Sequence, residues 1–130
     1  MAKCATAPGI IEIIRTEADG DYHVLVHTDP TSLDPQGGHW INNCNITCLG
    51  GAEHGDLVTE PICEHSISQS DAVSACQGYL NPQGPPPPIG SHVAVSGPWV
   101  LDVTHGWLEI HPATYVVLSA LAEPPSGGDA

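Results

Sequence analysis

Several short segments of this chain alternate apolar and polar residues, which is the pattern of β-strands with one buried face. In residues 22–28, for example, the alternation places His23 and Val24 on opposite faces of the predicted strand. We expect strands over residues 8–15, 22–28, 56–60, 92–102 and 106–111, with a last apolar segment at 115–118 that runs along the sheet.

One helix is predicted between the third and fourth of these strands. Ser68 is a favourable N-cap, Asp71 follows it three positions later as in a capping box, and Gly78 ends the segment. The resulting order of strand, strand, strand, helix, strand, strand is that of the OB-fold. We therefore expect a mainly β fold: a five-stranded antiparallel OB-like barrel with one short helix between strands 3 and 4.

The composition agrees with a small β-rich domain. The chain has 130 residues, no Phe, 14 Gly and 13 Pro, so its core must come from Val, Ile, Leu and Ala with a few Trp and Tyr. A chain of this length is typical of one domain. We expect a single barrel domain over residues 1–121 and a flexible polar tail over 122–130.

The charge balance restricts the partners of the chain. Fifteen acidic residues oppose only Lys3 and Arg15, which gives a formal net charge of −13. Nucleic-acid binding depends on Lys and Arg that neutralise phosphates, so we expect no nucleic-acid partner. No apolar stretch is long enough to cross a membrane, so we expect no membrane insertion. An unknown protein, a small ligand, a cation or a second copy of the chain remain as partners.

Five cysteines in a small acidic chain indicate an oxidising compartment, so we expect a secreted or periplasmic location without a leader peptide in this chain. Cys63 and Cys76 bracket the predicted helix and form the favoured disulfide. Residues 29–54 read as a long loop with a short helical turn, and this loop carries Cys44 and Cys48. A local disulfide there, or a bridge from one of the two to Cys4, is favoured over a metal cluster.

The richest chemistry lies around the last predicted hairpin. Strand alternation places Trp107, Glu109 and His111 on one face, with His105 in the turn before them. Together with His23 on the second strand, the residues His105, Glu109 and His111 form a candidate site for a divalent transition metal such as zinc, copper, nickel or non-haem iron. The alternative is that these groups are buried polar residues that bond to one another.

A second set of residues is a candidate for ligand binding. The acidic pair Asp19 and Asp21 precedes the second strand, close in sequence to His23. The indole of Trp107 can stack on a planar ligand, although core packing is its more common use.

Five segments of the chain resemble, in the same order, a family of small exported bacterial and archaeal proteins of uncharacterised function. The segments are residues 17–23, 54–61, 71–78, 95–102 and 105–112. The last contains the unusual string His-Gly-Trp-Leu-Glu-Ile-His-Pro. The resemblance covers about residues 4–118 and implies an OB-like barrel, but it implies no activity.

Two functions are consistent with these observations. The first is an extracytoplasmic, non-catalytic binding or structural module, with self-association as one version. The alternative is a metal-binding protein or metal-dependent hydrolase that uses the His/Glu cluster. Ser, His and Asp residues are present, but no nucleophile-elbow pattern accompanies them, so enzyme activity is the less favoured prediction.

Overall fold

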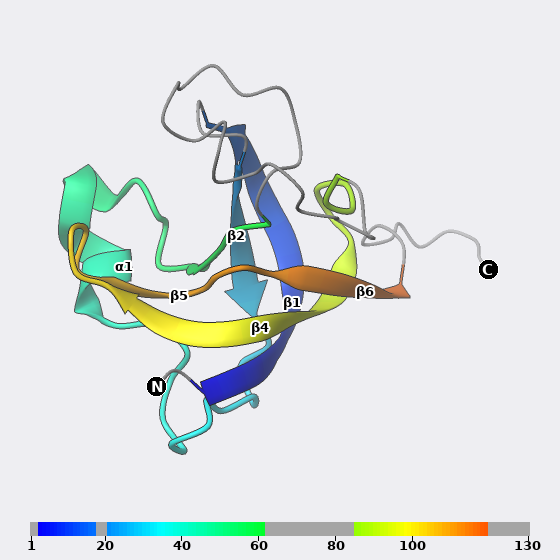
Figure 1. The fold of residues 1–130 in the computed structure, drawn as a ribbon, viewed down its shortest axis with the longest axis horizontal. Helices are drawn as coiled ribbons and strands as arrows, with labels where there is room; N and C mark the ends of the chain where they lie inside the picture. Colours follow the sequence, from blue (N-terminus) through cyan, green and yellow to red (C-terminus); the bar gives the residue numbers. More distant parts are fainter. Residues whose placement is uncertain (1–2, 18–20, 62–84, 120–130) are drawn as a thin grey trace, which may run out of the picture.

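The structure, a computed structural model, describes residues 3–17, 21–61 and 85–119 (Figure 1). Its strands are β1 (Lys3–Thr16), β2 (Tyr22–Thr28), β3 (Leu57–Thr59), β4 (His92–Asp102), β5 (Trp107–Ile110) and β6 (Thr114–Ser119). The helix α1 (Asn43–Thr47) and the 3-10 turn η1 (Cys48–Gly51) lie between β2 and β3. Each segment predicted to be extended overlaps one of these strands, which confirms where the strands lie. β1 begins five residues before the predicted segment 8–15, and the last segment forms a paired strand of the sheet.

The strands form one mixed sheet in the order β1-β2-β3-β5-β4-β6, and β1 also pairs with β4. β1 is long enough to pair with two strands, because its residues 3–10 pair with β4 and its residues 9–16 pair with β2. A register shift between Ile11 and Ile13 marks a β-bulge near the point where β1 passes from one neighbour to the other. Because a bulge bends a strand, β1 can wrap around the core.

The predicted architecture is wrong in its details. The described chain has six strands, and β3 pairs with β5 in parallel, so the sheet is not a five-stranded antiparallel barrel. The parallel pairing follows from the antiparallel pairings. β2 runs opposite to β1 and β3 opposite to β2, while β4 runs opposite to β1 and β5 opposite to β4, so β3 and β5 run in the same direction. The short helix α1 precedes β3, while the helix predicted at 68–78 and the tail predicted at 122–130 lie outside the described residues.

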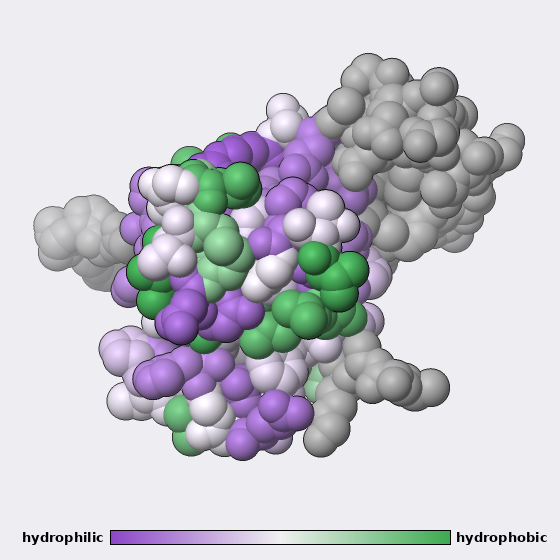
Figure 2. Space-filling view, turned by 90° about the vertical axis from the view of Figure 1, so that its left-hand side faces the viewer, coloured by the Kyte–Doolittle hydropathy of each residue, from purple (hydrophilic) through white to green (hydrophobic). Residues whose placement is uncertain are grey.

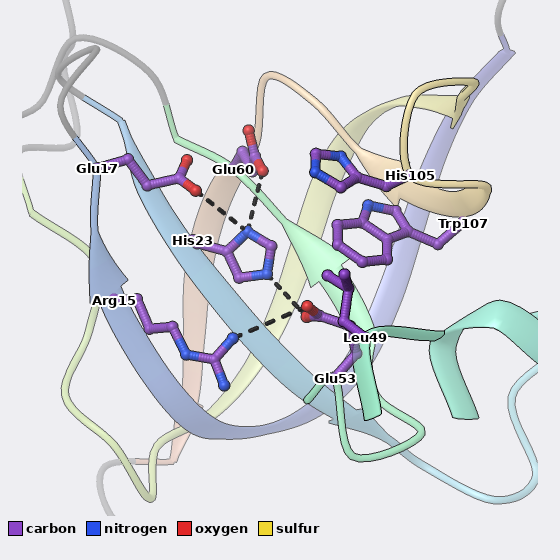
Figure 3. A pocket seen from close by; sticks show the side chains of 8 residues that line it. All are labelled: Arg15, Glu17, His23, Leu49, Glu53, Glu60, His105 and Trp107. Atoms are coloured by element: carbon purple, nitrogen blue, oxygen red, sulfur yellow. Dashed lines mark hydrogen bonds and ion pairs between the residues drawn. The ribbon is translucent and has the colours of Figure 1, made fainter. Parts of the chain in front are cut away.

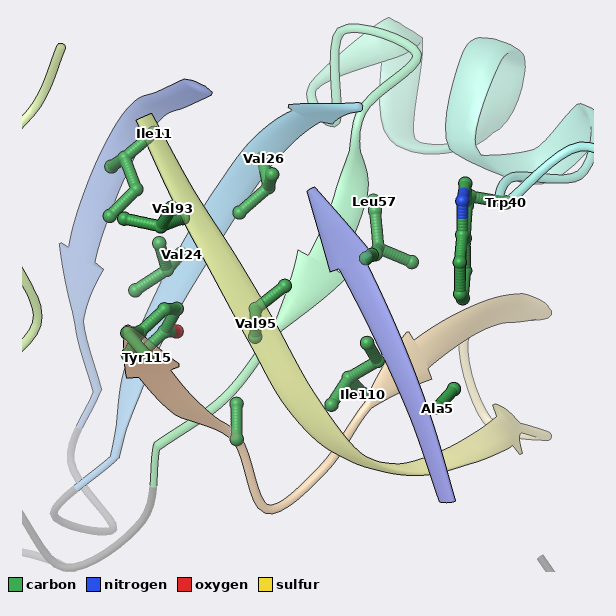
Figure 4. Close-up of a cluster of buried hydrophobic side chains, with 12 residues drawn as sticks. Ala5, Ile11, Val24, Val26, Trp40, Leu57, Val93, Val95, Ile110 and Tyr115 are labelled. Atoms are coloured by element: carbon green, nitrogen blue, oxygen red, sulfur yellow. The ribbon is translucent and has the colours of Figure 1, made fainter. Parts of the chain in front are cut away.

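The main core fills the space enclosed by the curved sheet and consists of aliphatic side chains with a few aromatic ones (Figure 4). Its fully buried members include Ile11, Val24, Val26, Leu57, Val93, Val95 and Ile110. The hydroxyl of Tyr115 reaches into this core and lies 2.7 Å from Oγ1 of Thr59, which satisfies two buried polar atoms at once. A Cβ at Gly97 would collide with the carbonyl oxygen of Pro112, so this close approach of β4 to the β5–β6 connection requires glycine.

A smaller apolar cluster lies on the opposite face of β2 and β3. It consists of Leu25, Val58 and Trp107, with Ile13 and Cys44 packed against it. Residues on this face of the sheet alternate with those of the main core, as the strand period requires. The polar residues that continue the face of this second cluster form the group of side chains described below.

The loop between β2 and β3 carries a local disulfide. The side chain of Asn42 accepts hydrogen bonds from the backbone of Cys44 and Asn45 and so caps α1. Of the two pairings that the sequence leaves open, the local one is formed, since Cys44 and Cys48 are bonded to each other and Cys4 is free and exposed. The predicted pair Cys63 and Cys76 lies outside the described residues.

No helix in the described part of the chain is long and apolar enough to span a membrane.

Candidate functional site

A buried histidine lies at the centre of a group of carboxylates (Figure 3). The side chain of His23 is only 7% exposed. Its Nδ1 lies 3.1 Å from Oε2 of Glu60 and 3.7 Å from Oε2 of Glu17, and its Nε2 lies 2.8 Å from Oε1 of Glu53. Arg15 supports the same group, since its Nη1 is 3.8 Å from Glu53 and its Nη2 donates to the carbonyl of Ala52.

Strand pairing explains why these side chains meet. Arg15 and His23 are partners across β1 and β2. On β3, Val58 is opposite Leu25 of β2, so Glu60, two residues further, continues the same face of the sheet beside His23.

The parallel pairing brings a second histidine to the other side of Glu60. Val58 is paired with Glu109 on β5, and the backbone N–H of Glu60 donates to the carbonyl of Ile110. His111 follows directly and lies with Nδ1 2.7 Å from Oε2 of Glu109 and 3.4 Å from Oε1 of Glu60. Its Nε2 lies 3.8 Å from Oδ2 of Asp21, at the start of β2. Glu60 is therefore shared by two imidazoles.

Both histidines are strongly basic in this environment. Burial on its own lowers the pKa of His23, but the hydrogen bonds with Glu60 and Glu53 outweigh it and raise the pKa to about 9. The hydrogen bond with Glu109 is the main cause that raises the pKa of His111 to about 9, against the effect of burial. In the metal-free protein, each histidine is an imidazolium at neutral pH and serves as counter-ion to the carboxylates.

In the described part of the chain, two overlapping sets of side chains have the geometry to hold a metal ion. One set is Glu17, His23 and Glu60, and the other is Asp21, Glu60 and His111. In each set, one potential ligand atom per residue lies within 4.8 Å of the others. One imidazole nitrogen with carboxylate oxygens is a donor set that suits divalent transition metals. Once deprotonated, these imidazoles present the lone pairs that such coordination needs.

A pocket of about 170 Å³ leads to the first of these sets. It is lined by Arg15, Glu17, His23, Leu49, Glu53, Glu60, His105 and Trp107 (Figure 3). The face of the molecule at the α1 end shows separate hydrophobic patches divided by hydrophilic surface (Figure 2). The pocket is small, and its lining combines charged side chains with the apolar surfaces of Leu49 and Trp107, which leaves room for an ion and a few atoms of a ligand.

One wall of the pocket is an aromatic stack. The rings of His105 and Trp107 lie 4.4 Å apart and almost parallel, at 3°. Asp102 accepts from the backbone N–H of His105 and lies 2.7 Å from its Nδ1, and this bond raises the pKa of His105. The indole ring of Trp107 also contacts the imidazole of His23, which meets it edge-on with 5.8 Å between the ring centroids.

The structure brings together three of the four predicted metal ligands. His23 and His111 both contact Glu60, and Glu109 contacts His111. His23 and His111 belong to different potential ligand sets, and Glu109 belongs to neither among the described residues. His105 lines the pocket but is likewise in neither set.

The residues predicted to bind a ligand are placed as follows. Asp21 is buried beside His111, and Asp19 lies outside the described residues. Trp107 is 2% exposed, because His105 covers one face of its ring. Its Nε1–H donates to Oε1 of Glu109.

Sequence reasoning does not single out three carboxylates of the cluster, which are Glu17, Glu53 and Glu60. For Glu60 a signal exists, because alternation along β3 places it on the face of Val58. That signal becomes useful only with the registers of β2–β3 and β3–β5, which the sequence does not reveal. Glu53 lies in a loop without periodicity, and no pattern indicates its contact with His23.

Comparisons of the chain with family models, with curated proteins and with solved structures yield no match.

Proposed function

We propose that this protein is a binding module for a divalent transition-metal ion, held by Glu17, His23 and Glu60. The observation that carries the proposal is the orientation of His23. Its Nδ1 faces Glu60 and Glu17, while its Nε2 is fixed by the buried carboxylate of Glu53. Metal-binding histidines typically have this arrangement, in which one nitrogen binds the ion and the other donates to a carboxylate.

The local charge supports a cation as the ligand. Glu17, Asp21, Glu53, Glu60 and Glu109 surround the two histidines, and Arg15 is the cation that accompanies them in the described part of the chain. Carboxylates of this density repel one another unless positive charge is supplied. The two imidazolium groups supply part of it, and a divalent ion that replaces a proton at His23 supplies more.

Isothermal titration of untagged, EDTA-treated protein with Zn²⁺ tests the proposal. We expect saturable binding that is far tighter than binding of Ca²⁺, which prefers all-oxygen sites. His23→Gln should weaken Zn²⁺ binding at least about tenfold. The matched control is His92→Gln, because His92 pairs with Asp29 at a half-exposed position away from the site.

The competing explanation is that the histidines are only buried counter-ions. This explanation predicts that the wild-type protein shows no stoichiometric Zn²⁺ binding, or that His23→Gln and His92→Gln weaken Zn²⁺ binding equally. Either result would refute the proposed metal site.

We propose an extracytoplasmic location and an OB type of fold for this module. The Cys44–Cys48 disulfide supports the location, since such bonds persist in oxidising compartments. The strand order β1-β2-β3-β5-β4 with the additional β1–β4 pairing supports the fold type. Membership of the family of small exported proteins with the His-Gly-Trp-x-Glu-Ile-His-Pro motif is part of the same proposal.

Self-association is a second candidate function, favoured by strand β6. This strand ends the sheet order, and its residues Val116, Val117 and Leu118 are 64%, 48% and 52% exposed. Thr114–Ser119 has no charged side chain, so little charge repulsion from this strand itself would oppose contact between two copies along it. Sedimentation of wild type and Val117→Lys tests this candidate. A concentration-dependent dimer that the substitution abolishes supports it, and a wild-type monomer at all concentrations rules it out.

A further inference from the structure

We infer that the site holds two metal ions rather than one, with Glu60 as the carboxylate that bridges them. The second ion is held by Asp21, Glu60 and His111. This inference rests on the proposed function, since it adds a neighbouring position to the site at Glu17, His23 and Glu60.

The two oxygens of Glu60 face different imidazoles. Oε2 lies 3.1 Å from Nδ1 of His23, and Oε1 lies 3.4 Å from Nδ1 of His111. A carboxylate that uses one oxygen on each side can bridge two ions, which in such centres lie about 3.5–4 Å apart. The side chain of Glu60 is 12% exposed, so its orientation is set by the surrounding protein.

His111 has the same kind of support as His23. Its Nδ1 is bonded to Glu109, which is buried and also accepts from the indole N–H of Trp107. Its Nε2 is directed toward Asp21, which is also buried. Nδ1 of His111 faces both Glu109 and Glu60, while Nε2 faces Asp21. A potential ligand atom from each of Asp21, Glu60 and His111 lies within 4.8 Å of the others, so this ring can join the set once it is deprotonated. Each of the two histidines has one nitrogen bonded to a buried glutamate, Glu53 for His23 and Glu109 for His111.

The two positions are distinct in what surrounds them. Glu17, His23 and Glu60 line the pocket, while Asp21 and His111 are not among its lining residues. The first ion is therefore the one that a molecule in the pocket would reach. The second ion, at Asp21 and His111, does not face this pocket and offsets the charge of Asp21, Glu109 and Glu60.

Counting Zn²⁺ per chain tests the inference. Untagged protein is saturated with Zn²⁺, passed through a desalting column, and examined by elemental analysis and native mass spectrometry. We expect two Zn²⁺ ions in the wild type and one each in Asp21→Asn and Glu17→Gln. Glu60→Gln should retain neither ion through the column. The matched control is Asp29→Asn, whose carboxylate also pairs with a histidine, His92, and which should keep two ions.

A coupled spectrum gives a second readout. In protein loaded with Mn²⁺, two ions that share Glu60 should give an exchange-coupled electron paramagnetic resonance signal that Asp21→Asn converts to that of an isolated ion. Circular dichroism must show that each variant is folded. If Asp21→Asn is unfolded, His111→Gln replaces it.

The outcomes separate the inference from the proposal on which it rests. One Zn²⁺ per wild-type chain, lost in Glu17→Gln and kept in Asp21→Asn, overturns the second ion and leaves the first. Two ions that both survive Asp21→Asn and His111→Gln also overturn it. No Zn²⁺ in the wild type refutes the metal site as a whole.

Discussion

Glu53 combines deep burial with contacts to two cationic side chains. It is 2% exposed, lies 2.8 Å from Nε2 of His23 and is 3.8 Å from Arg15. We predict that Glu53→Gln keeps the fold but weakens Zn²⁺ binding about ten- to a hundredfold, because the carboxylate that orients the imidazole is lost. Isothermal titration measures the Zn²⁺ affinity. The control is Asp29→Asn, which also replaces a histidine-paired carboxylate by its amide. Unchanged affinity in Glu53→Gln would mean that Glu53 does not position His23.

Asp56 is a buried carboxylate with its own pH dependence. It is 1% exposed, and its Oδ2 has no hydrogen-bond donor within the described part of the chain. Burial is the main cause that raises its pKa to about 7, and the neighbouring carboxylate of Glu12 adds to it. His27, with Nδ1 3.2 Å from Oδ1, acts in the opposite direction.

The raised pKa of Asp56 determines how its contribution to stability changes with pH. The folded protein keeps a proton on Asp56 that the unfolded chain releases near its ordinary pKa, so this contribution to stability is lost as the pH rises from about 4 to 7. We predict that Asp56→Asn is more stable than the wild type at pH 8 by at least about 1 kcal/mol, with a smaller difference at pH 5. Urea unfolding at both pH values provides the measurement. An equal difference at both would contradict the assignment.

The residues that sequence analysis can select are those with a strong local pattern. Trp107, Glu109 and His111 alternate on one short strand, and His23 lies on another, so all four are recognisable as polar or aromatic positions on strand faces. Glu60 escapes because its role depends on two strand registers. Those registers are set by side-chain packing between segments about 35 to 50 residues apart, which single-segment alternation does not encode.

At the scale of elements, the strands were predictable because alternation is a local property of the sequence. The pairing was not, since the direction and register of β3 against β5 depend on how β1, β2 and β4 fold around the core. The loop between β2 and β3 contains the expected short helical turn, and its local disulfide is one of the two cysteine pairings that the sequence leaves open. The backbone positions that shape the pocket wall, such as Leu49 with φ of 54°, had no signal in the sequence.

The disulfide joins α1 to the pocket wall that begins at Leu49. We predict that Cys44→Ala/Cys48→Ala lowers the free energy of unfolding by about 2 kcal/mol, as loop closure of this length implies. It should also weaken Zn²⁺ binding less than His23→Gln does, since it leaves the ligands in place. Urea unfolding gives the first value and titration the second. Cys4→Ala, at an exposed free cysteine, should change neither.

At the scale of the whole molecule, the main feature is the excess of negative charge. The formal net charge of −13 comes from fifteen acidic residues against two basic ones, and the carboxylates around Glu60 add a local concentration of the same sign. A net charge this far from zero destabilises the compact state through self-repulsion. The proposed metal binding would relieve this repulsion at one place, and screening by salt would relieve it over the entire surface.

This predicts that salt stabilises the metal-free protein. Raising NaCl from low concentration to the molar range, where the Debye length falls to about 3 Å, should increase the free energy of unfolding by about 1 kcal/mol and Tm by roughly 3–5 °C. NaCl and KCl should act equally, because screening depends on ionic strength and not on the identity of the cation. In the Zn²⁺-saturated protein the gain should be smaller, since bound ions already neutralise the Glu60 cluster. A Tm that falls with NaCl would show that self-repulsion does not govern stability. A gain in Tm that is the same with and without Zn²⁺ would show that bound ions do not relieve this repulsion at the Glu60 cluster.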